Sequence, residues 1–320
     1  MASLSGSGEA VGGAQPLDDV LAGVVATLIR RGADGVEQHG VEADPDRPDE
    51  SALGHTALRQ TRREQNGPEQ TAPQQTGLEQ TGLEQAGPKH GGREHGGREQ
   101  SVRRPGMAAR PYAVDCGGGS GRRAVPLALH GAEVTVIDAS IDALAILHRR
   151  ALEAGVADYV HGTQADVEDL SELLEASSVD LVLLHNVLGD TRDPAGVVTA
   201  AAHAVAAGGY LSVVVTNPAA VVIARALSGD LHGALSELTA QDDPRHRGLD
   251  FTLLTDLVQA AGLDVVSTLG LDAISSMIPG AVLEGQPGVA QSLAELDRRT
   301  SSQSPFREIA GQLHLLARRH

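Results

Sequence analysis

The stretch VDCGGGSG (residues 114–121) decides the fold, because it joins the end of an apolar strand to a glycine-rich turn. Its three alternate glycines, Gly117, Gly119 and Gly121, are followed by a helical pattern. Glycine lets the backbone turn tightly and approach a ligand closely, and the start of a helix offers unpaired N–H groups. The stretch therefore predicts a strand, a loop and a helix arranged around a bound ligand.

The spacing of these glycines points to one kind of ligand. A dinucleotide-binding loop reads G-x-G-x-x-G, but counted from Gly117 the last glycine position is occupied by Arg122. The observed pattern, D-x-G-x-G-x-G, resembles the first motif of S-adenosylmethionine-dependent methyltransferases of Rossmann-like fold. The resemblance implies that S-adenosylmethionine is the cofactor and that Asp115, Gly117, Gly119 and Gly121 bind it.

A second apolar strand, at 133–138, supports this interpretation because it also ends in an acid, Asp138. A carboxylate at the tip of the second strand suits both hydroxyls of an adenosine ribose and repels a 2′-phosphate, which argues against NADP. The alternative is that Asp138 caps the helix starting at Ile141, with Ser140 as the competing cap.

Composition limits the functional classes. The chain has 320 residues, enough for up to two domains, and a net charge of −17, so no DNA partner is expected and RNA would need a local basic patch. The single cysteine, Cys116, excludes an intramolecular disulfide and a cysteine metal cluster, and we expect it to be a small buried filler. The absence of a leader pattern and of a long apolar run predicts a cytoplasmic protein with no membrane contact and no metal.

The sequence divides into an N-terminal helical and loop segment, a low-complexity insert and a methyltransferase domain, at residues 1–60, 61–108 and 109–320. Leu17 to Arg31 has apolar residues at helical spacing and is expected to pack partly on the methyltransferase domain. Residues 61–100 repeat every five residues with few apolar side chains, which predicts a disordered insert. A metal contact by His90 and His95 is the disfavoured alternative, since nothing fixes their geometry.

After residue 109, strand and helix patterns alternate, which predicts a sheet covered by helices on both faces. We expect strands at 112–116, 133–138, 158–161, 179–185, 210–216, 263–269 and 312–318. We expect helices at about 121–130, 141–155, 167–176, 194–207 and 251–261. The fold class is therefore α/β, a Rossmann-like, mostly parallel seven-stranded sheet of the class I methyltransferase type.

Ligands of such sheets bind beyond the carboxyl ends of the strands. In methyltransferases an acid at the position of Asp166 usually binds the adenine amino group while a neighbouring backbone amide, here that of Ala165, meets the ring; a helix cap is the alternative for Asp166. His185 ends the fourth strand, where cofactor and acceptor meet, and is a candidate for both cofactor contact and catalysis. Asn217 follows the fifth strand, whereas His314 lies in an apolar strand and is expected to be structural.

A closer resemblance appears in DLVLLHNVL (residues 180–188), in AGGYLS (residues 207–212) with Asn217, and in the tail from Leu293 to Arg318. These segments are similar to the bacterial tRNA 5-carboxymethoxyuridine methyltransferases. TALRQ (residues 56–60) is similar to a segment of that family whose arginine helps hold the cofactor's carboxylate, which implies this role for Arg59.

The closer resemblance implies a carboxylate acceptor, which is ionised at neutral pH and needs no general base. His185 and Asn217 would then orient it, and an arginine would pair with its charge: Arg225, Arg245 or Arg247. The sequence departs from that family in three places. The basic run expected before the helix at 251–261 is reduced to residues 245–247 among acids, and the aromatic residue expected after Leu188 is replaced by residues 189–190. In addition, the insert separates Arg59 from the glycine loop, and of these three departures we use the first two to judge the acceptor. The first two departures disfavour RNA.

Two other functions stay open. One is a small-molecule O- or N-methyltransferase, in which His185 would be the base, and the other is a non-catalytic S-adenosylmethionine-binding module.

Overall fold

The computed structural model describes residues 16–37, 110–241, 248–279 and 288–320, all within one compact unit of the chain. Its strands are β1 (Tyr112–Cys116), β2 (Glu133–Asp138), β3 (Val160–Gln164), β4 (Val179–His185), β5 (Val205–Thr216), β6 (Asp264–Leu271) and β7 (Gln312–Arg318). Its helices are α1 (Pro16–Glu37), α2 (Ala124–Leu129), α3 (Ile141–Glu153), α4 (Leu170–Leu173), α5 (Pro194–Ala204), α6 (Pro218–Leu227), α7 (Leu231–Ala240), α8 (Phe251–Ala260), α10 (Val289–Thr300) and α11 (Phe306–Ile309).

The seven strands form one sheet in the order β3-β2-β1-β4-β5-β7-β6. The pairs among β1 to β5 are parallel, whereas β7 runs antiparallel to both of its neighbours, β5 and β6. The predicted fold class, a mostly parallel seven-stranded sheet, is therefore confirmed. The reversal in strand order at β1 and β4 places their carboxyl ends at the switch point, where sheets of this kind bind ligands.

Four strands, β1, β2, β4 and β7, have the predicted bounds; β6 lies at Asp264–Leu271 rather than at 263–269, and β3 and β5 differ for a physical reason. The third begins at Val160, because residues 157–159 form a turn of 3-10 helix. Most of β3 is exposed at the sheet edge and lacked an apolar signal. The fifth begins at Val205, because residues 206–209 form an irregularity between the Val179–Val205 pair and the rest of β5. This bulge, which contains the left-handed Gly208, has the sequence of a turn.

The helix after the glycine loop is shorter than predicted. It begins at Ala124 rather than at residue 121, because Gly119 and Gly121 have positive φ angles that a right-handed helix does not allow. Ligand donors at this turn therefore come from the loop itself and not from the start of a long helix. Helices α6 and α7 were not predicted, although each begins with a polar cap, Asn217 and Asp230, that accepts a backbone hydrogen bond.

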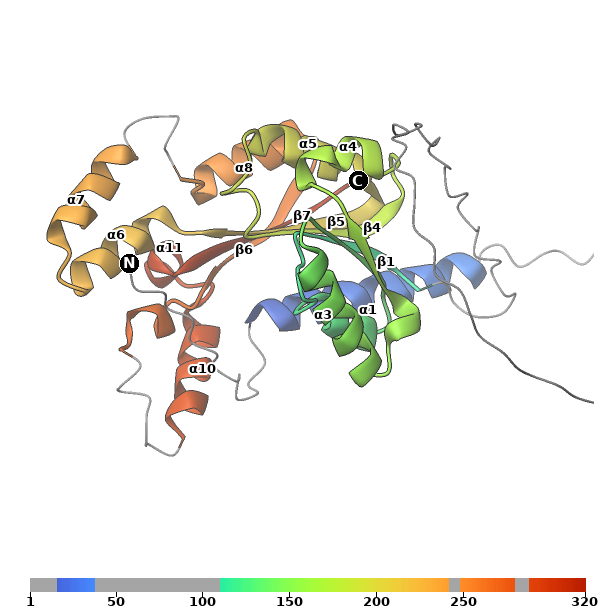
Figure 1. The fold of residues 1–320 in the computed structure, drawn as a ribbon, viewed down its shortest axis with the longest axis horizontal. Helices are drawn as coiled ribbons and strands as arrows, with labels where there is room; N and C mark the ends of the chain where they lie inside the picture. The colour runs from blue at the N-terminus through green and yellow to red at the C-terminus, as the bar shows by residue number, and fades with distance from the viewer. Residues whose placement is uncertain (1–15, 38–109, 242–247, 280–287) are drawn as a thin grey trace, which may run out of the picture. The chain divides into compact units, whose positions relative to one another are not determined.

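Helices cover both faces of the sheet (Figure 1), and each face has its own apolar core. Alternate residues along β4 divide between the two cores: Val182 and Leu184 pack toward α5 and α8, while Leu181 and Leu183 pack toward α1, α2 and α3. Cys116 is buried and unbridged in the first core, as predicted. Such two-sided burial explains the continuous apolar run of β4.

The N-terminal helix α1 belongs to the second core. Its buried residues recur at helical spacing: Leu17, Leu21, Val24, Val25 and Leu28. Asp18 in its first turn pairs with Arg123, which immediately precedes α2. Helix α1 is therefore tied by apolar packing and by an ion pair to the segment that follows the glycine loop. The predicted insert at 61–108 lies outside the described residues.

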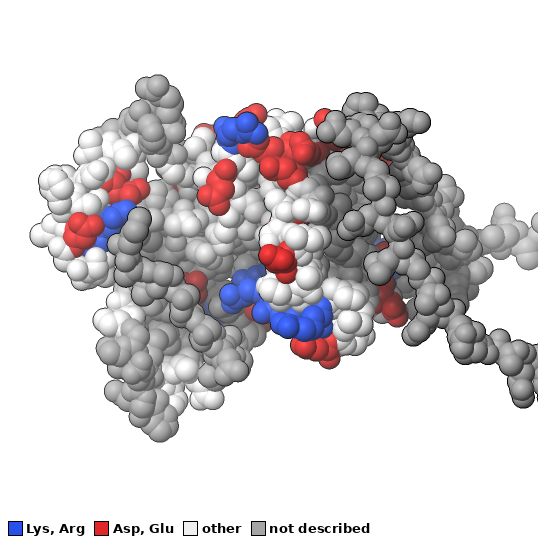
Figure 2. Space-filling view, in the orientation of Figure 1, with Lys and Arg blue, Asp and Glu red and all other residues white. Residues whose placement is uncertain are grey.

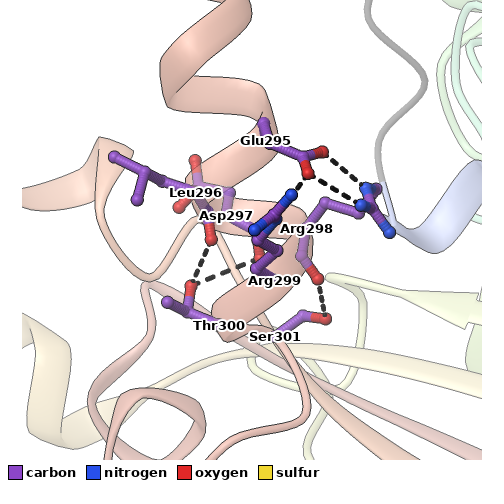
Figure 3. Close-up of polar contacts among 7 residues, drawn as sticks. All are labelled: Glu295, Leu296, Asp297, Arg298, Arg299, Thr300 and Ser301. Atoms are coloured by element: carbon purple, nitrogen blue, oxygen red, sulfur yellow. Dashed lines mark hydrogen bonds and ion pairs between the residues drawn. The ribbon is translucent and has the colours of Figure 1, made fainter.

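Helix α10 fixes the position of the segment that follows β6, at residues 274–275. Its buried Asp297 accepts hydrogen bonds from the backbone N–H groups of Ile274 and Ser275, at 2.7 and 3.2 Å. The opposite face of the helix carries an exposed cluster in which Glu295 pairs with Arg298 and Arg299 (Figure 3). Exposed pairs stabilise little, so we assign the anchoring of this helix to Asp297. No helix in the described ranges has the length and apolar character to cross a membrane.

Candidate functional site

The three alternate glycines of the loop all adopt positive φ angles, but they serve different purposes. A side chain on Gly117 would collide with Val187, and one on Gly121 would collide with Leu147, so these two glycines are required by packing. Within the part of the chain that the structure describes, a Cβ on Gly119 would have one neighbour within 4 Å, Asp138 Oδ2 at 3.7 Å. The middle glycine therefore borders open space beside Asp138.

Asp138 is held in place by the loop that it faces. Its Oδ2 accepts from the N–H of Gly119 and its Oδ1 from the N–H of Ser140, both at 2.9 Å. Ser140 caps α3 by accepting from Ala143 N–H, so the alternative in which Asp138 is the cap is wrong. The two bonds leave other lone pairs of the carboxylate for a ligand.

Asp115 is a buried acid beneath the same loop. One of its carboxylate oxygens, Oδ2, is buried with no hydrogen-bond partner among the described residues, and the side chain lies against Gly118. Burial raises the pKa of Asp115 to about 7; Arg123 opposes this shift and Asp138 adds to it. A carboxyl group of this kind is poised to respond to a cation placed beside it.

Two clefts meet at this loop and share Gly117 and Asn186. The larger, of about 620 Å³, has Asp138 and Asp166 in its lining. Glu168 and Arg192 also line it, and Glu168 accepts hydrogen bonds from both the backbone N–H and the guanidinium of Arg192. The smaller, of about 300 Å³, is polar and is lined by the side chains of both acids and bases: Asp115, Arg122, Arg123, His185 and Asp272.

The structure gives Asp166 and Ala165 local partners as well. Asp166 Oδ1 accepts from Glu168 N–H at 3.0 Å and caps a short 3-10 helix, as the alternative interpretation anticipated. The N–H of Ala165 donates to the carbonyl of Asp138 at 3.3 Å. Asp166 still lines the larger cleft with an exposed side chain, so the adenine contact stays a prediction for both residues.

His185 lies at the end of β4 and begins a chain of three polar side chains. Its Nε2 is 2.9 Å from Ser212 Oγ, and the same oxygen is 3.0 Å from His314 Nε2. Burial, followed by His314 and Arg123, holds the pKa of His185 well below its usual value, and burial with Arg123 lowers that of His314 to about 4. His314 is fully buried, as expected of a structural residue, but sequence reasoning missed Ser212.

Asn217 does not face the clefts that hold His185. It is buried, its Nδ2 donates to the carbonyls of Glu308 and Ala310, and its Oδ1 accepts from Ala219 N–H at the start of α6. These bonds use both amide hydrogens. The geometry is that of a helix cap tying α6 to the segment before β7, and it argues against the predicted role in orienting the acceptor.

Two further cavities lie beyond β4 and β5, between α6 and its neighbours. The first, of about 270 Å³, joins Asn186 and Asp190 to Thr216 and Val221. The second, of about 200 Å³, shares Thr216 and Val221 and is mainly apolar, with Ile223 in its wall. Their described lining contains neither lysine, arginine nor an aromatic residue, and its charged members are Asp190 and Glu237.

The other predicted contacts fall in different places. Arg59, Arg245 and Arg247 lie outside the described residues. Arg225 does not line these clefts; it forms ion pairs with Asp230 and Glu237. Within the described ranges, no group of three or more His, Cys, Asp or Glu side chains is arranged to hold a metal ion.

Comparison with known proteins agrees with this architecture. The family model described as a methyltransferase domain matches residues 114–213, from β1 to β5. The tRNA 5-carboxymethoxyuridine methyltransferase of Escherichia coli K12 is 29% identical over 117 residues, which cover 37% of this chain and 44% of the relative. The ubiquinone biosynthesis O-methyltransferase of Sodalis glossinidius is 35% identical over 125 residues, which cover 38% of this chain and 49% of the relative.

Among solved structures, an S-adenosylmethionine-dependent methyltransferase from Mesorhizobium loti is 22% identical, with 65% of this chain and 90% of that one covered and a TM-score of 0.44. The chain spans less than half the length of the two curated relatives above. The matched segment contains the glycine loop and Asp138, and it coincides with the parallel part of the sheet. Residues 114–213 therefore match a methyltransferase domain, and they lie in a sheet of the class I methyltransferase type.

Proposed function

We propose that this protein transfers a methyl group from S-adenosylmethionine to a small molecule with an apolar body. The observation that carries the cofactor assignment is the open space at Gly119, whose N–H donates to Asp138, a residue in the lining of the larger cleft. Asp138 is the ribose ligand in this proposal and Asp166 is the adenine ligand, whereas the N–H of Ala165 already donates to the carbonyl of Asp138. Arg59 is proposed to contact the cofactor's carboxylate.

The smaller cleft suits the charged end of the cofactor. The unpartnered Oδ2 of Asp115 offers an acceptor for a cationic group, while Arg122 and Arg123 line the same cleft and offer positive charge. When bound, S-adenosylmethionine supplies an electrophilic methyl group on a sulfonium. The contribution of the chain is to position the reactants and to exclude water, with His185 at the border between the cofactor and the acceptor.

The acceptor class follows from the residues that line the two cavities beside α6. Ile223, Leu227 and Met277 give the second cavity an apolar lining. The first has two acids in its lining, Asp190 and Glu237, of which Glu237 is paired with Arg225. A negatively charged acceptor would meet repulsion there, whereas a neutral hydroxyl or an amine on an apolar body would not. For such acceptors His185 is the candidate base, because its lowered pKa keeps it unprotonated at neutral pH.

The carboxylate of a tRNA wobble nucleotide is the second candidate acceptor. It is favoured by the similarity of residues 180–188 to the tRNA-modifying family and by the 29% identity to the Escherichia coli relative. On the described part of the face in Figure 2, arginine side chains form small groups beside acids rather than a broad basic patch. RNA binding relies on such patches and on aromatic stacking, so we rank this candidate second.

Two measurements test the proposal in sequence. Calorimetry with S-adenosylmethionine, NAD and NADP should give binding of the first alone; binding of NAD without S-adenosylmethionine would overturn the cofactor assignment. Methyl transfer from labelled cofactor is then measured with apolar phenols, apolar amines, fatty acids and total tRNA. Transfer to phenols or amines supports the first candidate, and transfer to tRNA supports the second. Tight cofactor binding without transfer to any acceptor class would favour a non-catalytic binding module.

A further inference from the structure

We propose that Ser212 and His314 are positioning residues that hold His185 in a single neutral tautomer at the edge of the cofactor cleft. The inference deepens the proposed function, because its catalytic consequence requires that His185 meet the acceptor. The structural part of the inference, the fixed tautomer, does not require that His185 meet an acceptor. The two parts are therefore tested by different measurements.

The sheet register brings the three side chains together. Val214 of β5 pairs with His185 on β4 and with His314 on β7, so the two histidines flank the same strand position. Ser212 lies two residues before Val214 and therefore points to the same face of the sheet. The rings of His185 and His314 are 6.5 Å apart and nearly perpendicular, at 86°, with the serine hydroxyl bonded to both.

Counting hydrogens shows why this arrangement fixes the tautomers. A serine hydroxyl has one hydrogen, so it donates to one imidazole and accepts from the other. One Nε2 must then carry a hydrogen and the other must not. When both rings are neutral, His185 and His314 are opposite tautomers. A change of tautomer at His185 requires a simultaneous change at His314, which is fully buried and has no access to water.

The surroundings keep both rings neutral. Burial is the largest cause of the lowered pKa at each ring, and Arg123 lowers the pKa of both. The charged residues that line the smaller cleft with His185 are Asp115, Arg122, Arg123 and Asp272. Burial raises the pKa of Asp115 to about 7 and also raises that of Asp272, so these two acids carry less negative charge below neutral pH than ordinary carboxylates do.

The other ring nitrogen of His185, Nδ1, is the atom that can bond to a ligand, because Nε2 is bonded to Ser212. His185 Nδ1 is buried and has no hydrogen-bond partner in the described protein, while the side chain as a whole is partly exposed and lines the smaller cleft. Because Nε2 is bonded to Ser212, the locked tautomer decides whether Nδ1 donates or accepts a hydrogen bond. His314 is too deeply buried to touch a ligand and acts through Ser212, as a positioning residue.

The structural test is imidazole 15N–1H correlation NMR on the full chain labelled at histidine, between pH 6 and 9. We expect His185 to show one neutral tautomer throughout this range. In Ser212→Ala the signals of His185 should average between tautomers, because the hydroxyl that couples the two rings is lost. Ser212→Thr, which keeps a hydroxyl and suits a strand, should restore the single tautomer. Ser267→Ala, a strand serine on β6, and His161→Gln, an exposed histidine on β3, are matched controls.

The catalytic test uses an acceptor found with the wild-type protein. Ser212→Ala should lower kcat about tenfold and leave the cofactor Kd within about twofold, since orientation and not binding is lost. His314→Gln, which hydrogen-bonds but does not restrict the tautomer, should give a similar loss, and Ser212→Thr should recover most of the activity. An unchanged NMR tautomer in Ser212→Ala would overturn the proposal, whatever the activity. A locked tautomer with no loss of kcat would overturn its catalytic part, and a locked tautomer in a protein without transferase activity would refute the proposed function alone.

Discussion

The proposed cofactor half and the proposed acceptor half of the sheet's carboxyl edge, called here the cofactor side and the acceptor side, are built by different means. On the cofactor side, at β1 to β3, the left-handed Gly117 lines both clefts, the N–H of Gly119 holds Asp138, and carboxylates line the larger cleft. On the acceptor side, beyond β4 and β5, helix α6 gives mainly apolar walls, and the polar groups of His185, Ser212 and Asn217 bond to other parts of the protein. The difference teaches that recognition by the backbone leaves a fixed sequence pattern, whereas recognition by apolar walls leaves none.

The two halves also differ in the sign of their pH response. Burial raises the pKa of the acid on the cofactor side, Asp115, and lowers the pKa of the histidines on the acceptor side. In each case burial favours the uncharged form. The stability of the protein should therefore be limited by Asp115 at high pH and by the histidines at low pH.

The largest expected effect is the loss of cofactor binding in Gly119→Val. A branched side chain at this position would occupy the open space beside Asp138. We expect S-adenosylmethionine affinity to fall on the order of 10³-fold or more, measured by calorimetry. Gly155→Val is the matched control, because Gly155 has a similar positive φ of 71° and no neighbour within 4 Å of a Cβ. If the control loses as much affinity, strain and not cleft blockage explains the result.

The next effect is a gain of stability in Asp115→Asn at alkaline pH. The folded pKa of about 7 exceeds the ordinary value of 3.8, so the folded state holds the extra proton between these values. Stability from this group is present at low pH and is lost as pH rises to about 7. We expect denaturant unfolding at pH 8.5 to show the variant more stable by up to about 4 kcal/mol, with little difference at pH 4. Equal stability of Asp115→Asn and wild type at pH 8.5 would contradict this prediction. The control is Asp142→Asn, because Asp142 is exposed.

On the acceptor side, His314 should produce the opposite trend. Its folded pKa of about 4 lies below the ordinary 6.5, so stability from this group is complete above pH 6.5 and is lost as pH falls to about 4. The expected loss is about 3 kcal/mol. Unfolding of wild type and His314→Gln measured from pH 7 to 4 should show a shallower decline in the variant. Parallel curves would mean that this ring is not forced to remain neutral.

The smallest effect concerns the apolar wall. Ile223→Asp should lower kcat/KM for an apolar acceptor about tenfold, because it removes apolar contact and adds charge to the second cavity. Cofactor affinity should not change. Leu238→Asp, on the exposed surface of α7 and away from both cavities, should leave both constants unchanged. A loss of cofactor affinity in Ile223→Asp would show that the two halves are not separate sites.

The sequence alone determined the cofactor half, because its chemistry is local: three glycines within five residues and an acid at the end of the next strand suffice to predict it. The same reasoning predicted the sheet, since strands buried on both faces have continuous apolar runs. It did not anticipate the capping contacts of Asn217, the hydrogen bonds of Ser212 to two histidines, or the cavities beside α6. These depend on contacts between residues far apart in the chain, such as the 102 residues that separate Ser212 from His314. No local pattern encodes such a contact; only the packing of β4, β5 and β7 into one sheet decided it.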